Sequence, residues 1–175
     1  MSITKSIPFN LFVAKFPLID LPLTLTNESS RHFSQQNDPF PGPMIHQFIL
    51  PYDGEEFDDQ VTEYLPCLQF PGTAGFKALI YWKAGLLQYG YHLVTFTDKG
   101  EFIDKRGIAG TKLNGDALAL SVATIDEDWV IHIVGGVSSA TEINYDPSNS
   151  QSFQLELLPT GEIINVNPTP EAETD

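Results

Sequence analysis

Prolines concentrate in the first part of the chain, and this limits the fold more than any other feature of the sequence. Nine of the 13 prolines and eight of the 12 phenylalanines lie within the first 71 residues. Because proline lacks a backbone N–H and fixes φ, this part is unsuited to central strands of a sheet. We therefore expect residues 1–53 to be a mainly extended wrap that lays its phenylalanines on the domain, namely Phe9, Phe12, Phe16, Phe33, Phe40 and Phe48.

Local patterns add detail to this Pro-rich part. The block Asp38–Pro43 (DPFPGP) predicts a turn or rigid loop, since a residue before proline is driven away from helix. Ile45–Leu50 (IHQFIL) then predicts a short strand. Gly54–Tyr64 predicts a helix, because its apolar residues share one helical face and four acidic residues crowd its first turns. A solvated acidic loop is the alternative for that segment.

From Phe76 onward the sequence alternates with period two, and turn residues separate the runs. The spacing is typical of an antiparallel β-meander, and Asn114-Gly115 is its strongest hairpin signal. We predict a mainly β single domain over residues 1–166, with a meander in 76–166 that forms a curved sheet, sandwich or partly open barrel. At most one or two short helices and a disordered acidic tail at 167–175 complete the prediction. The expected strands are Tyr64–Phe70, Phe76–Ala84, Leu87–Thr97, Glu101–Ile108, Ala117–Ile125, Trp129–Val134, Ser152–Leu158 and Glu162–Val166.

Charge is distributed unevenly. The chain has 9 basic and 23 acidic residues, a net charge of −14, and Lys112 is its last basic residue. Residues 113–175 then contain 11 acidic residues and no basic one. Nucleic-acid binding and anionic membrane surfaces both require Lys and Arg, so we expect neither as a partner. A basic protein partner is favoured electrostatically, although solubility accounts for the charge equally well.

The chain shows no targeting or redox signature. Its N-terminal apolar stretches are interrupted by lysines, an aspartate and prolines, and no run approaches the length of a membrane span, so we predict cytoplasmic residence. Cys67 is the only cysteine, which rules out an intramolecular disulfide. A lone cysteine in an apolar strand-like run predicts a small buried hydrophobe.

No motif for catalysis, metal binding or nucleotide binding is present. Three histidines fall on predicted strands (His46, His92 and His132), but no two share a spacing that would place two ligands together. Glycine-rich phosphate loops and the G-x-S-x-G elbow are absent as well. We therefore predict no metal, no cofactor and no catalytic residue, and the sequence favours a protein that is not an enzyme.

Aromatic residues cluster on two adjacent predicted strands. Tyr and Trp combine a large apolar area with a polar tip, which suits ligand pockets and protein interfaces. The candidate binding residues are therefore Tyr81, Trp82, Tyr89, Tyr91 and His92. The alternative is that these side chains form half of the hydrophobic core.

Two turn patterns, T-D-x-G-x-x-I-D after one strand and T-I-D-x-D before another, lie within residues 77–134. This stretch resembles a family of functionally uncharacterised bacterial proteins with β-meander hairpins. The resemblance implies the meander and transfers no activity or catalytic residue. Two functions stay open beside an enzyme of unrecognised type: an immunity- or inhibitor-like interaction module for a basic partner, and a β-barrel-like binder of a small ligand.

Overall fold

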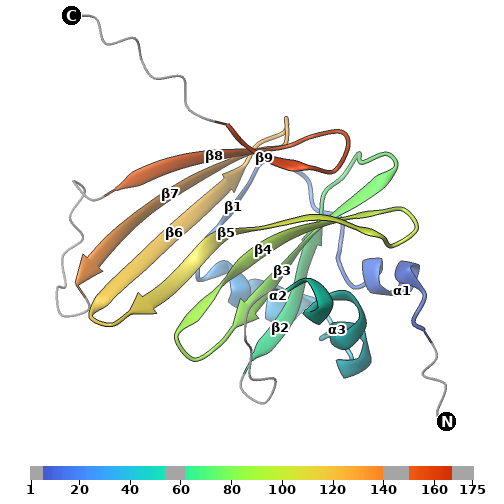
Figure 1. Cartoon of the computed structure of the whole chain (residues 1–175), viewed down its shortest axis with the longest axis horizontal. Helices are drawn as coiled ribbons and strands as arrows, with labels where there is room; N and C mark the ends of the chain where they lie inside the picture. The colour runs from blue at the N-terminus through green and yellow to red at the C-terminus, as the bar shows by residue number, and fades with distance from the viewer. Residues whose placement is uncertain (1–5, 54–61, 140–149, 167–175) are drawn as a thin grey trace, which may run out of the picture.

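The computed structural model of the protein describes residues 6–53, 62–139 and 150–166. Nine antiparallel strands are the main elements of this part of the chain (Figure 1). Within these residues one open, curved sheet runs in the order β2 to β9, so each strand pairs with its neighbour in sequence. The predicted β-meander is confirmed. The strands are β1 (Leu23–Leu25), β2 (Glu63–Gln69), β3 (Phe76–Ala84), β4 (Gln88–Thr97), β5 (Phe102–Asn114), β6 (Ala117–Ile125), β7 (Val130–Ser139), β8 (Gln151–Leu157) and β9 (Ile163–Val166).

Two strands are longer than the sequence predicts. β5 continues past Ile108 to Asn114, and β7 continues through Gly135 and Gly136 to Ser139. Glycine does not end β7 because Gly135 pairs on both sides, with Ser121 and with Gln151. The hairpin turn that follows β5 is also shifted by one residue from the prediction. Asn114 pairs with Ala117, and Gly115, at φ +58°, begins the two-residue turn between them.

The N-terminal part is more helical than expected. It contains α1 (Phe9–Val13), α2 (Ser29–Gln36) and α3 (Gly42–Phe48), followed by a 3-10 turn at Leu50–Tyr52. The prediction of mainly extended chain is wrong here, as is the strand at Ile45–Leu50, and the described residues contain one helix more than expected. Pro43 occupies the first turn of α3, where its missing N–H costs nothing. Met44 and Phe48 lie one helical turn apart and are both buried.

The predicted packing of the phenylalanines is confirmed. Five of the six are buried and Phe9 is half-buried. Most of them meet the outer face of β3 and β4; Phe12, for example, lies 4.6 Å from Phe48 and 6.0 Å from Phe96 between ring centroids. Phe33 of α2 instead belongs to the second core, where it lies 6.4 Å from Tyr91. The N-terminal part therefore covers one face of the first strands.

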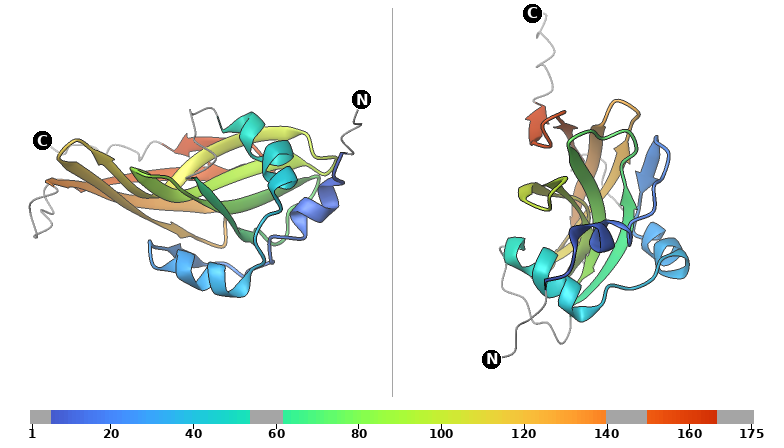
Figure 2. Two further views of the ribbon diagram at one scale, coloured as in Figure 1. Left: turned by 90° about the horizontal axis from the view of Figure 1, so that it is seen from below. Right: turned by 90° about the vertical axis from the view of Figure 1, so that its right-hand side faces the viewer.

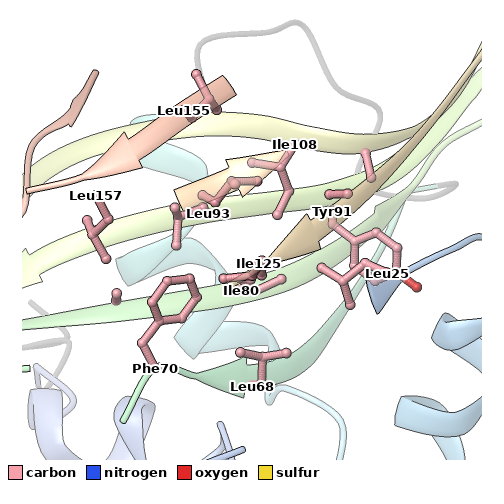
Figure 3. Packing of buried hydrophobic residues seen from close by; sticks show 14 of the residues in the cluster. Leu25, Leu68, Phe70, Ile80, Tyr91, Leu93, Ile108, Ile125, Leu155 and Leu157 are labelled. Atoms are coloured by element: carbon pink, nitrogen blue, oxygen red, sulfur yellow. The ribbon is translucent and has the colours of Figure 1, made fainter. Parts of the chain in front are cut away.

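The second and larger core lies inside the curve of the sheet. Only residues 110–114 of β5 pair with β6, whereas the preceding part of β5 pairs with β4 alone and β1 takes its place beside β6. The sheet therefore bends at β5, and its two parts face each other (Figure 2). Figure 3 shows the side chains that meet there, from Leu68 and Ile80 through Leu93 and Ile108 to Leu155 and Leu157.

The edge strand β2 contains one of the prolines of the first half. Pro66 lies within it, and the register with β3 shifts between Pro66 and Leu68. A proline at an edge and beside a bulge removes no central hydrogen bond, as the sequence predicts. Cys67 is buried here, also as predicted.

Some predictions fall outside the described residues. These are most of the helix predicted at Gly54–Tyr64, whose last two residues belong to β2, the polar connection at 140–149 and the tail at 167–175. Among the residues that are described, no helix has the length and apolar character needed to cross a membrane.

Candidate functional site

A groove of about 560 Å³ crosses the sheet from β4 to β9. The groove exists because β5 pairs with β6 only from Gly110 to Asn114. The residues of β5 before Gly110 pair with β4 alone, which leaves part of the β6–β8 face without a covering strand. Residues 88–92, 106–112 and 119–121 line one part of the groove, and side chains of β7, β8 and β9 line the rest. The groove is therefore a consequence of the bend at β5.

Small residues form a row across the middle of this region. Gly90 pairs with Gly110, Gly110 with Ser121, and Ser121 with Gly135. A Cβ atom on Gly90 would collide with the Ala109 carbonyl oxygen, and one on Gly110 with that of Tyr89. Strands β4 and β5 approach so closely here that only glycine fits at these two positions.

The side of the groove formed by β7 and β8 is apolar. Ile133 and Leu155 are buried at its base. Phe153 and Val137 lie above them with exposed fractions of 53% and 48%. Ile108 of β5 adds a further apolar side chain to the lining. An exposed phenylalanine in a concave apolar surface is typical of a binding site rather than of an ordinary sheet face.

The charged residues of the lining are all basic. Lys83, Arg106 and Lys112 contribute to it, and no aspartate or glutamate does among the described residues. The contrast with the whole chain is large, since only 9 of its residues are basic and 23 are acidic. The lining of the groove is thus apolar and basic in a strongly acidic protein, and two of its three basic residues, Lys83 and Arg106, are paired with aspartates outside the lining.

The three basic residues differ in their exposure and in their hydrogen-bond partners. Arg106 donates hydrogen bonds to Asp104 Oδ1 at 3.0 Å and to the Ile163 carbonyl at 3.3 Å, and its side chain is 42% exposed. Lys112 is exposed at the end of the groove, where it pairs across the strands with Gln88. Lys112 is therefore the basic residue best placed to meet a ligand.

Lys83 belongs to a buried ionic cluster next to the groove. Its Nζ lies 2.7 Å from Asp53 Oδ2, and Lys105 Nζ lies 2.9 Å from Asp53 Oδ1. The Tyr64 hydroxyl donates a third hydrogen bond to Asp53, at 3.1 Å. Burial by itself raises the pKa of Asp53, but the hydrogen bonds and charges of the two lysines outweigh it and hold this pKa below its usual value. Asp53 thus stays ionised and fixes the position of Lys83.

The structure separates the five predicted binding residues. Tyr89, Tyr91 and His92 line the groove, whereas Tyr81 and Trp82 do not. Tyr81 is buried among the residues beneath α1 and α3 and stacks on His92 at 5.3 Å between ring centroids. Trp82 packs instead against Tyr89 and Tyr91, at 5.4 and 4.8 Å.

Among the tyrosines of the lining, Tyr89 is the accessible one. Its exposed fraction is 39%, against 1% for Tyr91. The Tyr91 hydroxyl donates a hydrogen bond of 2.7 Å to the Thr26 carbonyl, and burial raises its pKa. Tyr91 therefore supports the groove from beneath, and Tyr89 is exposed within it.

The histidines do not form a metal site. His46 is exposed on α3 and His92 stacks on Tyr81. His132 lies on β7, with Asp126 Oδ2 at 3.2 Å and Gln154 at 3.1 Å. No three His, Cys, Asp or Glu residues come close enough to hold a metal ion in the part of the chain that the structure describes.

Sequence reasoning missed Phe153, Arg106 and Lys112. A signal existed for Phe153, because it alternates with Leu155 and Leu157 in the predicted strand. The two basic residues carried no comparable signal, since their approach to Phe153 depends on the bend at β5.

Comparison of the chain with family models, with curated proteins and with solved structures found no match. The resemblance of residues 77–134 to bacterial β-meander proteins therefore stays a prediction. The function has to be inferred from the chemistry of the groove.

Proposed function

We propose that the protein binds a small amphipathic molecule with an anionic group in the groove between β4 and β9. The observation that supports this proposal is the lining of the groove, which combines exposed apolar side chains with Lys83, Arg106 and Lys112. Among the described residues, no aspartate or glutamate lines the groove. Its volume of about 560 Å³ lies within the range of about 300–1,000 Å³ that is usual for small-molecule sites.

The two kinds of side chain assign a place to each part of the ligand. The apolar part packs on Phe153 and Val137, which are exposed over the buried Ile133. The anionic group lies toward the exposed Lys112, whose ammonium group offers charged donors. Tyr89 adds an aromatic surface that is accessible to the ligand.

A basic protein partner, expected from the charge of residues 113–175, stays a prediction. On the outer face of β6 and β7, Val122 and Val134 are cross-strand partners with exposed fractions of 39% and 50%. They offer an apolar contact surface to a protein, which does not by itself select a basic one. Neither valine lines the groove. The small-ligand proposal therefore has the stronger support.

Titration with dodecyl amphiphiles of different head groups tests the proposal. Isothermal titration calorimetry below the critical micelle concentration would compare dodecanoate, dodecanol and dodecyltrimethylammonium. We expect dodecanoate to bind most tightly and the cationic amphiphile least. Equal affinity for all three would show that the basic residues play no part, and no binding of dodecanoate would refute the proposal.

A blocking substitution and its matched control locate the binding. Ala119 lines the groove from β6, so Ala119→Trp fills it. Val122 lies on the same strand but does not line the groove, so Val122→Trp adds a comparable side chain elsewhere. We expect Ala119→Trp to abolish dodecanoate binding and Val122→Trp to preserve it.

A further inference from the structure

The turn between β3 and β4 exposes two adjacent leucines. Leu86 is 81% exposed and Leu87 is 63% exposed, and Leu86 is the most exposed large hydrophobic residue in the described chain. No charged residue occurs from Ala84 through Tyr91. Scattered single apolar residues on a surface need no explanation, but two neighbours at the tip of an uncharged hairpin do.

The hairpin holds these leucines in place. The Gly85 N–H donates a hydrogen bond of 2.8 Å to the Gln88 carbonyl, which closes the turn. The Leu113 N–H donates another, also of 2.8 Å, to the Leu87 carbonyl and joins the tip to β5. In Figure 1 this turn and the β5–β6 turn end at the same side of the sheet, at the lower left. The leucines are therefore presented by an ordered backbone.

The tip continues directly into the groove. Gln88 and Tyr89, the residues after Leu87, both line it, and Lys112 pairs with Gln88. The order outward from the groove is thus a lysine, a partly exposed tyrosine and two exposed leucines. At a lipid surface leucine lies deepest, tyrosine lies at the level of the head groups, and lysine extends its amine into water.

We infer that the β3–β4 hairpin tip docks on an uncharged lipid surface and places the mouth of the groove against it. This inference rests on the proposed function, because a mainly uncharged surface that holds the anionic amphiphile as a minor component is the source of what the groove binds. The net charge of −14 disfavours anionic lipids, so a zwitterionic surface is the expected partner. A protein partner is less favoured, since leucine is under-represented among the residues that dominate protein interfaces.

Flotation with phosphatidylcholine vesicles tests the docking. The double variant Leu86→Ser/Leu87→Ser should lower the fraction bound to vesicles by at least about tenfold, because two leucines lose their burial in the lipid. The matched control is Leu11→Ser/Leu18→Ser, which removes two other leucines with exposed fractions of 52% and 66%. Vesicle binding should be unchanged in the control, and equal loss in both variants would overturn the inference.

Ala119→Trp separates this inference from the proposed function. Leu86→Ser/Leu87→Ser should still bind dissolved dodecanoate, and Ala119→Trp should still bind vesicles. Loss of vesicle binding in Ala119→Trp would mean that the groove merely captures lipid, which overturns docking by the tip. Vesicle binding without any dodecanoate binding would keep the docking and remove the proposed ligand. Failure of the wild type to bind vesicles, or a dimer that only Leu86→Ser/Leu87→Ser dissociates, would also overturn the inference.

Discussion

The Asp104 carboxylate accepts a hydrogen bond of 2.9 Å from the main-chain N–H of Ile163. Strand β9 is therefore joined to β5 by a side chain instead of a ladder of main-chain bonds. Two further bonds act beside it, from Arg106 to the Ile163 carbonyl at 3.3 Å and from the Thr95 hydroxyl to the Gly161 carbonyl at 2.6 Å. Side chains thus close the curve of the sheet next to the groove while β5 and β9 remain separate strands.

Replacing Asp104 with alanine should destabilise the protein by about 1–3 kcal/mol, because the Ile163 N–H loses its acceptor and Arg106 loses its carboxylate. Urea unfolding followed by circular dichroism measures the change. The control is Asp98→Ala, which removes an exposed carboxylate from the turn before β5 and should change stability by no more than about 0.5 kcal/mol. Equal stability of the two variants would contradict a role for Asp104 in holding β9.

Replacing Asp53 with asparagine should destabilise the protein by about 3 kcal/mol at neutral pH, because Lys83 is buried and loses the carboxylate that neutralises it. The pH dependence has a definite sign. The folded-state pKa of Asp53 lies below its ordinary value of 3.8, so its stabilisation is fully present above that pH. It is lost as the pH falls from there through the folded-state pKa.

Unfolding free energies of the wild type and Asp53→Asn, measured from pH 7 to pH 2, check this prediction. The difference between the two proteins should be constant down to about pH 4 and should shrink below it. A difference that already shrinks between pH 7 and pH 5 would contradict a lowered pKa for Asp53.

Replacing Gly110 with alanine should destabilise the protein by about 1–3 kcal/mol, since its φ of +153° disfavours a side chain and a Cβ would strike the Tyr89 carbonyl. Gly107 provides the matched control on the same strand. A Cβ there would make an ordinary contact of 3.7 Å with the His92 ring. Thermal unfolding should separate the two variants clearly, and a Gly107→Ala protein as unstable as Gly110→Ala would contradict the close approach of β4 and β5.

The fold could be predicted from the sequence where the side-chain pattern is local. Phe76–Ala84 and Ala117–Ile125 are strands within the predicted bounds because their apolar and β-branched residues persist between clear turns. The strand predicted at Ile45–Leu50 is wrong because a short apolar run fits a strand and a helix equally well. The block that contains the nearby Pro43 predicts a loop, whereas Pro43 lies in the first turn of a helix.

The candidate site could be predicted only in part. Tyr89 and His92 were found because aromatic residues cluster on one predicted hairpin. The groove itself depends on the alignment of Gly90 with Gly110 across the strands and on the departure of β5 from β6, and neither is visible before the register is known. For the same reason the sequence does not show that Lys112 and Phe153, on strands far apart in the chain, line one groove.

Replacing Lys112 with glutamine should weaken dodecanoate binding by a factor of about 1.4 to 5, because an exposed ion pair contributes about 0.2–1 kcal/mol. Glutamine keeps most of the length of the side chain and removes only its charge. Lys99→Gln is the control, since it removes a positive charge from the exposed turn between β4 and β5. Calorimetry at low and high salt measures both variants. Raised salt should weaken wild-type binding and narrow its difference from Lys112→Gln, whereas an equal loss in Lys99→Gln would mean that only the net charge of the protein matters.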